Sequence, residues 1–96
     1  MNVRLEVMNG AQDGDEFRIK KSAVIGREKN NEISLQNDRY ISRRHAILNI
    51  SGEEIILEDI GSTNGTFYDG ERLFRPVSLS NGDFFRVGRT WIQISW

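Results

Sequence analysis

The chain has 96 residues, 38% of them hydrophobic and 28% charged, which predicts one domain with a single core and excludes disorder for most of the chain. It has no cysteine and one histidine, which excludes disulfides, a cysteine nucleophile, iron–sulfur clusters and histidine-rich metal sites. Thirteen basic and fourteen acidic residues give a net charge of −1, so no global field attracts nucleic acid or an anionic membrane. Any anion site must be local, and we expect neither a metal nor a cofactor.

The first residues alternate polar and apolar side chains and lack the basic and apolar regions of a signal peptide. The longest apolar runs, such as Ile55–Leu57, are far shorter than the ~18 residues of a membrane helix. We therefore expect residues 1–96 to form one soluble, monomeric domain without membrane insertion, in the cytoplasm or another intracellular compartment.

Short alternating runs separated by turn residues recur along the chain, a rhythm typical of antiparallel sandwiches and barrels. Residues 3–7 and 17–19 predict a first hairpin, and Asp69-Gly70 predicts a type I′ turn, which needs positive φ at both positions. Pro76 lies where a strand would begin or be interrupted. Further strands are expected at 23–25, 33–35, 46–50, 55–60, 66–68, 72–74, 84–87 and 90–95. The fold class is all-β, an antiparallel sandwich of about eleven short strands with binding loops at one end.

Three loops carry residues suited to binding an anion. Gly26-Arg27 presents a guanidinium at the end of a strand, residues 41–45 contain a serine and two arginines, and residues 61–66 contain hydroxyl and amide side chains between glycines. None of the three contains a carboxylate. Residues 38–45 carry one aspartate and three arginines, a local charge of +2 on a chain of −1. Forked donors, hydroxyls and backbone N–H groups are what a phosphate dianion requires.

At these residues the chain resembles the forkhead-associated (FHA) domain family over essentially its whole length. The similar motifs are Gly26-Arg27, Ser42-Arg43-Arg44-His45, Asn64-Gly65-Thr66 and Asp69-Gly70, in this order. Each motif alone is weak, but the order and spacing of the set make coincidence improbable. One departure is Asp69, where the family often has asparagine.

The resemblance implies an eleven-stranded β-sandwich whose loops bind a phosphothreonine peptide without catalysis, since the family recognises phosphorylated motifs through arginine clusters. It implies that Arg27, Ser42, Arg43 and Thr63 bind the phosphate and that Asn64 holds the peptide backbone. Gly26, His45 and Gly65 would shape the loops. The expected partner is a phosphothreonine-containing protein, or a segment of the same chain, in Ser/Thr kinase signalling.

Purely structural roles, without a ligand, could also explain the same residues. Ser42 could simply cap a turn, and Asn64-Gly65 is a common turn whether or not a ligand binds. If a strand has begun at residue 43, Arg43 and Arg44 point to opposite faces, and we favour Arg43 as the ligand contact. His45, which has no catalytic partner in the sequence, is expected to brace the loops.

Two other functions remain open as alternatives. One is an FHA-like scaffold that binds an unphosphorylated protein. The other is a nucleic-acid-binding β-domain that uses the arginines and exposed aromatic residues, against which the net charge of −1 argues. An enzyme is not expected, because no acid–base pair, nucleophile or metal set can be assembled from these loops.

Overall fold

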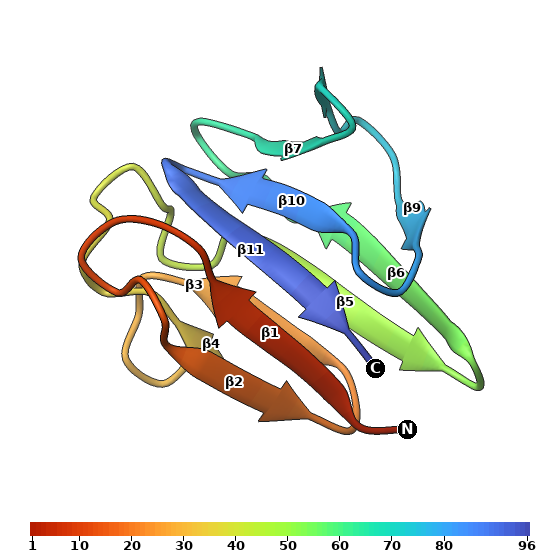
Figure 1. Ribbon diagram of the computed structural model, residues 1–96. Helices are drawn as coiled ribbons and strands as arrows, with labels where there is room; N and C mark the ends of the chain where they lie inside the picture. Colours follow the sequence, from red (N-terminus) through yellow and green to blue (C-terminus); the bar gives the residue numbers. More distant parts are fainter.

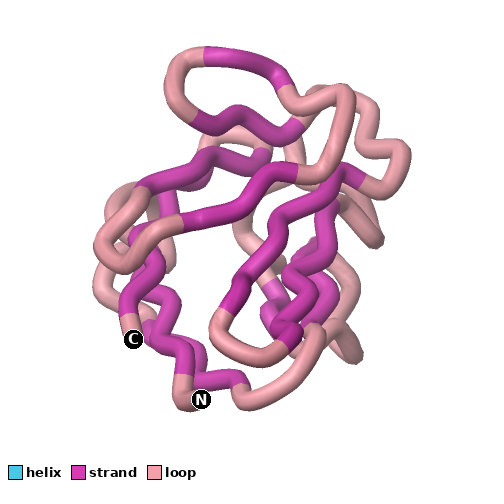
Figure 2. Tube along the Cα trace, turned by 90° about the vertical axis from the view of Figure 1, so that its right-hand side faces the viewer, coloured by secondary structure: helices cyan, strands magenta, loops and turns pink.

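The computed structural model describes all residues from 1 to 96 as strands joined by loops, with no helix (Figure 2). The strands are β1 (Val3–Val7), β2 (Glu16–Ile19), β3 (Ala23–Gly26), β4 (Ile33–Ser34), β5 (Ala46–Ser51), β6 (Glu54–Asp59), β7 (Thr66–Tyr68), β8 (Glu71–Arg72), β9 (Val77–Leu79), β10 (Phe84–Val87) and β11 (Thr90–Ser95). The expected all-β architecture is confirmed. No helix long and apolar enough to span a membrane occurs.

Two sheets pack face to face. Sheet A has six strands in the order β2-β1-β11-β10-β7-β8, and sheet B has five in the order β4-β3-β5-β6-β9. In Figure 1 sheet A lies in front of sheet B. All strand pairs are antiparallel except β3 and β4, which pair in parallel with Ile25 opposite Ile33. The apolar alternation that predicts both strands carries no information about their relative direction, so this exception is visible only in the structure.

The core lies between the sheets and follows from the period of two along each strand. Alternate residues turn inward, as in β1, where Val3, Leu5 and Val7 are buried and the residues between them are half-buried. The core comprises 19 buried hydrophobic residues. Phe85 of β10 is the largest of them and has no exposed surface.

The hairpin at Asp69-Gly70 forms as expected, with φ of 54° and 79° at the two turn residues. The strand after it is shorter than expected, because β8 ends at Arg72. Leu73 still turns into the core, but Phe74 is 87% exposed. Pro76 immediately precedes β9. A proline there removes no hydrogen bond from the sheet, because its missing N–H lies outside the strand.

The loops with the candidate residues gather at one end of the sandwich. The β4–β5 and β6–β7 loops lie at the left-hand end in Figure 1, and the N-terminus lies at the other end. Backbone hydrogen bonds join the loops, with the Arg27 N–H donating to the Ser42 carbonyl at 3.0 Å and the Ile60 N–H to the His45 carbonyl at 3.1 Å. The strands thus bring together segments that are far apart in the sequence.

Candidate functional site

Arg27 follows directly after β3 and is exposed. Its Nε donates a hydrogen bond to the Ile41 carbonyl at 2.9 Å, which fastens the guanidinium beside the β4–β5 loop. No carboxylate pairs with it, because the three ion pairs of the chain all lie on β1 and β2. The terminal nitrogens of Arg27 are therefore available to an anion.

Ser42 lies beside this arginine and contacts the β6–β7 loop. Its Oγ accepts a hydrogen bond from the Thr63 backbone N–H at 3.1 Å, so the hydroxyl hydrogen is still available for donation. The same contact occupies the Thr63 N–H, which leaves the Thr63 hydroxyl as that residue's free donor. Serine and threonine from two different loops are thus brought into one place.

Asn64 joins the same two loops at a second point. Its Nδ2 donates to the Tyr40 carbonyl at 2.8 Å, and the side chain is otherwise exposed. The amide therefore has a fixed orientation while its oxygen and second N–H face outward, which is the arrangement that pairing with an extended backbone requires.

His45 is fully buried between the loops. Its Nδ1 accepts from the Ser42 N–H at 3.0 Å, so Nε2 carries the proton and donates to the Gly65 carbonyl at 2.8 Å. Burial lowers the pKa of His45, and the Gly65 carbonyl opposes this only in part. A neutral imidazole therefore links the β4–β5 and β6–β7 loops through one hydrogen bond from each ring nitrogen.

Gly26 permits a close approach of the β4–β5 loop. A Cβ atom at this position would lie 2.1 Å from the Arg43 carbonyl oxygen and 2.6 Å from Nδ2 of Asn31. Gly65 has φ of +92°, and a Cβ there would lie 2.7 Å from Nε of Arg72. At both positions a side chain larger than that of glycine would displace these neighbouring groups.

Arg43 and Arg44 are both exposed, but β5 begins only at Ala46. The strand has not begun at residue 43, so strand alternation does not separate the two arginines. The Val24 N–H donates to the Glu32 carboxylate at 2.8 Å and lowers the pKa of that carboxyl, and the charge of Arg44 is one of the smaller contributions to the same lowering. Neither Arg43 nor Arg44 forms an ion pair with a carboxylate, so the preference for Arg43 as the ligand contact stays a prediction.

Three residues that support the loops, Asn31, Asp59 and Asp38, were not singled out from the sequence as site residues. Asn31 is buried and donates to the Arg43 carbonyl at 2.7 Å. Asp59 accepts from the backbone N–H groups of Gly61 and Ser62 and from the hydroxyls of Ser62 and Thr66. Burial alone would raise the pKa of Asp59, but these hydrogen bonds outweigh it and lower the pKa. Aspartate three residues before serine is a turn signal that sequence analysis could have used.

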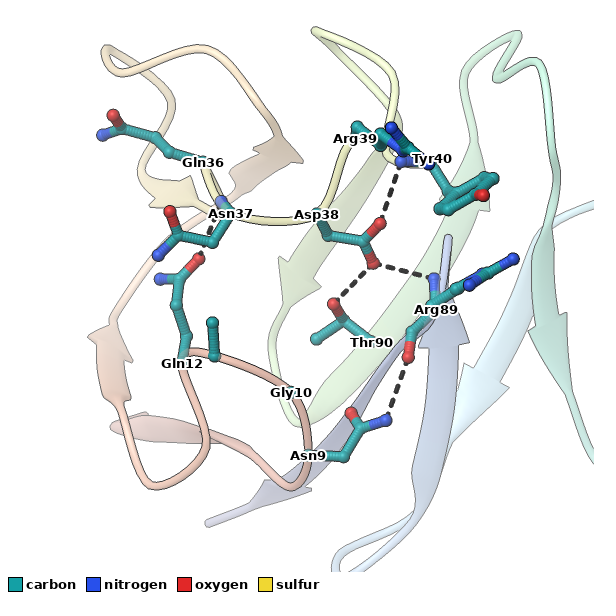
Figure 3. A pocket seen from close by; sticks show the side chains of 11 residues that line it. Asn9, Gly10, Gln12, Gln36, Asn37, Asp38, Arg39, Tyr40, Arg89 and Thr90 are labelled. Atoms are coloured by element: carbon teal, nitrogen blue, oxygen red, sulfur yellow. Dashed lines mark hydrogen bonds between the residues drawn. The ribbon is translucent and has the colours of Figure 1, made fainter.

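Asp38 anchors the β4–β5 loop from its other side. Figure 3 shows its carboxylate accepting from the backbone N–H of Arg89 at 2.8 Å and from the Thr90 hydroxyl at 2.7 Å. The Arg89 guanidinium stacks on the Tyr40 ring, 3.9 Å from its centroid. These residues line a polar pocket of about 370 Å³ next to the Tyr40 carbonyl that holds Asn64.

A sequence model of the FHA domain family matches residues 23–88, which is more than half of the chain. The chain belongs to the FHA domain family, whose members are protein-interaction modules. It is similar to FhaB of Mycobacterium tuberculosis, an FHA domain-containing protein, with 37% identity over 91 residues that cover 94% of this chain and 58% of FhaB. The chain therefore spans about three fifths of that relative's length.

Solved structures agree with this assignment. An FHA domain from a structural and functional analysis of phosphothreonine-dependent FHA interactions is 29% identical, with a TM-score of 0.88 over 100% of this chain and 97% of that chain. The FHA domain of FhaA, solved in complex with the intracellular domain of Rv3910, is 30% identical, with a TM-score of 0.84 over 96% of this chain and 98% of that chain. The expected family and fold are confirmed.

Proposed function

We propose that residues 1–96 form one FHA module that binds a phosphothreonine-containing segment, in a partner protein or in its own chain, as part of Ser/Thr kinase signalling. The observation that carries the proposal is that Arg27 and Ser42 lie side by side, joined through the hydrogen bond from the Arg27 N–H to the Ser42 carbonyl. Arg27 is fastened at the Ile41 carbonyl without a carboxylate partner, and Ser42 retains its hydroxyl hydrogen while accepting from Thr63.

In this proposal Arg27 and Arg43 supply charge-assisted donors to the phosphate oxygens, and the hydroxyls of Ser42 and Thr63 donate to the same group. Asn64 pairs with the peptide backbone through its free amide oxygen and N–H. Gly26, His45 and Gly65 hold the loops in place and do not touch the ligand. The proposed site needs neither a metal nor a cofactor.

The test is a pull-down of a phosphothreonine peptide library with the purified domain, beside the same library unphosphorylated. We expect enrichment from the phosphorylated library alone. Equal enrichment from both libraries would contradict the proposal and would favour the scaffold alternative, in which an unphosphorylated segment binds.

Calorimetric titration with matched phosphothreonine and phosphoserine peptides then measures the choice of phosphoamino acid. The phosphate is the same in both, so only the threonine methyl can discriminate. Burying one methyl contributes ~0.8 kcal/mol, about fourfold, and the cavity left by serine adds to this, so we expect a preference of at least about tenfold. Equal affinities would show that the loops form no pocket for the methyl group.

A further inference from the structure

The outer face of sheet A carries a transverse row of apolar and guanidinium side chains that the proposed phosphate site does not use. The strand registers place Arg86 opposite both Trp91 and Phe67, and Phe67 opposite Arg72. The row continues to Met8, whose N–H donates to the Trp91 carbonyl, and to Phe74 beyond β8. We call these six residues the aromatic–arginine row.

The row is continuous, with Phe67 and Arg86 half-buried at its centre and the other four residues exposed. Inward residues of the same strands, such as Phe85 and Ile92, fill the core, so the row faces outward by alternation. Met8, Trp91 and Phe74 are 37%, 43% and 87% exposed. No other element of the chain covers this face of sheet A, which is turned toward the viewer in Figure 1. Contiguous exposed apolar side chains of this kind mark interaction surfaces.

The arginines of the row are oriented by stacking. The Arg86 guanidinium lies 4.2 Å from the Phe67 ring centroid and 6.0 Å from that of Trp91, and it donates to the Gly88 carbonyl at 2.6 Å. The Arg72 guanidinium lies 5.9 Å from the Phe74 ring centroid. Apart from the Arg86 donor that Gly88 occupies, the guanidinium N–H groups remain free at the edge, where they match a carboxylate.

The charged residues of β1 and β2 on the same face pair with one another, and this contrast indicates what the row binds. Arg4 pairs with Glu6 and Glu16, and Arg18 pairs with Glu16, across β1 and β2. Arg86 and Arg72 make no such pair, and the row contains no carboxylate. A complementary partner therefore supplies both carboxylates and apolar side chains. Tryptophan, phenylalanine, methionine and arginine are also the residues enriched in protein interfaces.

The row reaches the β6–β7 loop, which carries Thr63 and Asn64 of the proposed site. Gly65 precedes β7, and the Arg72 side chain lies against it, so a ligand held at Asn64 is close to one end of the row. We propose that the row is a second contact surface for the phosphorylated partner, and that it binds an acidic segment with interspersed apolar residues outside the phosphothreonine motif. This inference rests on the proposed phosphopeptide function.

The test compares a short phosphothreonine peptide from the library with the same peptide carrying, at either end, a flexible linker and the segment Glu-Leu-Asp-Phe-Glu. A linker of about 15 glycine and serine residues spans on the order of 20 Å, comparable with the 33 × 27 × 23 Å domain. We expect the extended peptide to bind about tenfold more tightly, because the second contact becomes intramolecular. Equal affinity of the short and both extended peptides overturns the inference.

Variants of the row assign the gain to these residues. Arg86→Glu and Trp91→Gln should remove it and leave the affinity of the short peptide unchanged. The matched control is Arg18→Glu, the same charge reversal on β2 of the same sheet, which should retain the full gain. Phe74→Ser tests the row even if Arg86→Glu does not fold, because the Phe74 side chain packs against little else. Retention of the gain in Phe74→Ser and Trp91→Gln overturns the inference.

A separate measurement distinguishes failure of the row from failure of the phosphate site. Nuclear magnetic resonance titration with the acidic segment alone, without phosphothreonine, should shift the Trp91 indole and Phe67 signals and leave Arg27 and Ser42 unmoved. If the short phosphopeptide does not bind, the proposed function fails, and the row is still decided by these shifts. The inference is overturned if these signals shift with oligothymidine but not with the acidic segment. It is also overturned if the row instead holds a dimer that Trp91→Gln dissociates.

Discussion

His45 shows how one buried side chain connects two binding loops. The ring accepts from the Ser42 N–H and donates to the Gly65 carbonyl. The first contact requires the neutral form, and the second requires the proton on Nε2. Its backbone adds two further connections, to the Ile25 carbonyl and from the Ile60 N–H. Protonation of this ring would replace the acceptor at Nδ1 by a donor that faces another donor.

We predict a pH dependence of stability that belongs to His45, the single histidine of the chain. Its pKa is lowered from 6.5 in the folded protein, so the unfolded chain takes up the proton more readily. The contribution of neutral His45 is complete above pH 6.5 and is lost as the pH falls below that value, toward the lowered pKa of the folded state.

Calorimetric melting temperatures between pH 7.5 and pH 5 check this prediction. They should fall with pH in the parent protein, and His45→Ala should melt lower and without that slope. Asp59 does not interfere, because its folded pKa lies below 3.8 and its contribution is lost only at more acidic pH. An equal slope in His45→Ala would assign the effect to another group.

Arg27 is predicted to act on binding and not on folding. Charge-assisted hydrogen bonds are worth roughly 1.5–3 kcal/mol each, so Arg27→Ala should lower phosphopeptide affinity by a factor of about 10 to 150. The residue is exposed, and its side chain makes one hydrogen bond, so the melting temperature should change little. Isothermal titration measures the affinity and thermal unfolding measures the melting temperature, each beside Arg18→Ala, a variant far from the loops. Unchanged affinity in folded Arg27→Ala would remove it from the site.

At the level of elements, the β3–β4 and β4–β5 loops form one packed unit around Gly26. The Arg43 carbonyl accepts from Asn31 Nδ2 and from the Glu28 N–H, at 2.7 and 3.3 Å. The segment that presents Ser42 and Arg43 therefore depends on the end of β3 for its position. The β6–β7 loop is held separately, by the carboxylate of Asp59.

Gly26→Ala should weaken binding without touching the ligand. The new methyl group would lie 2.1 Å from the Arg43 carbonyl oxygen, so the β4–β5 loop must move away and lose the contacts to Asn31. We expect both the phosphopeptide affinity and the melting temperature to fall. Titration and thermal unfolding check this, with Lys29→Ala, an exposed change in the β3–β4 loop, as the control. Parent-like affinity would show that the loop position does not govern binding.

For the whole molecule, the two faces of sheet A have separate tasks. The inner face supplies the core, and the outer face carries the ion pairs of β1 and β2 and the aromatic–arginine row. Neighbouring residues on one strand therefore differ in their energetic roles. In β10, Phe85 has no exposed surface, whereas Phe84 is 46% exposed.

This difference predicts opposite outcomes for two adjacent substitutions. Phe85→Ala leaves a cavity between the sheets and should lower the free energy of unfolding by about 3–5 kcal/mol. In a domain of this size that is a fall of about 12 °C or more in melting temperature. Phe84→Ala removes only surface contacts and should change the melting temperature by a few degrees at most. Urea unfolding of both variants checks the pair, and similar losses would contradict the burial pattern.

Local chemistry determined much of this molecule in advance. The alternation of apolar residues predicts the strands, because a strand that packs on one face must repeat with a period of two. Asp69-Gly70 predicts its turn, because few residues tolerate positive φ at two successive positions. The motifs around Arg27, Ser42 and Asn64 predict the family and a candidate site. The roles of these residues in binding remain predictions.

Only the tertiary structure decided how these pieces meet. The parallel pairing of β4, the buried support from Asn31 and the point where β5 begins depend on contacts between segments that are separated in the sequence. The aromatic–arginine row is the clearest case, since Phe67, Arg72, Arg86 and Trp91 come from four strands. A one-dimensional pattern records the spacing along a strand, whereas the register between strands is set by packing of the core and turn geometry.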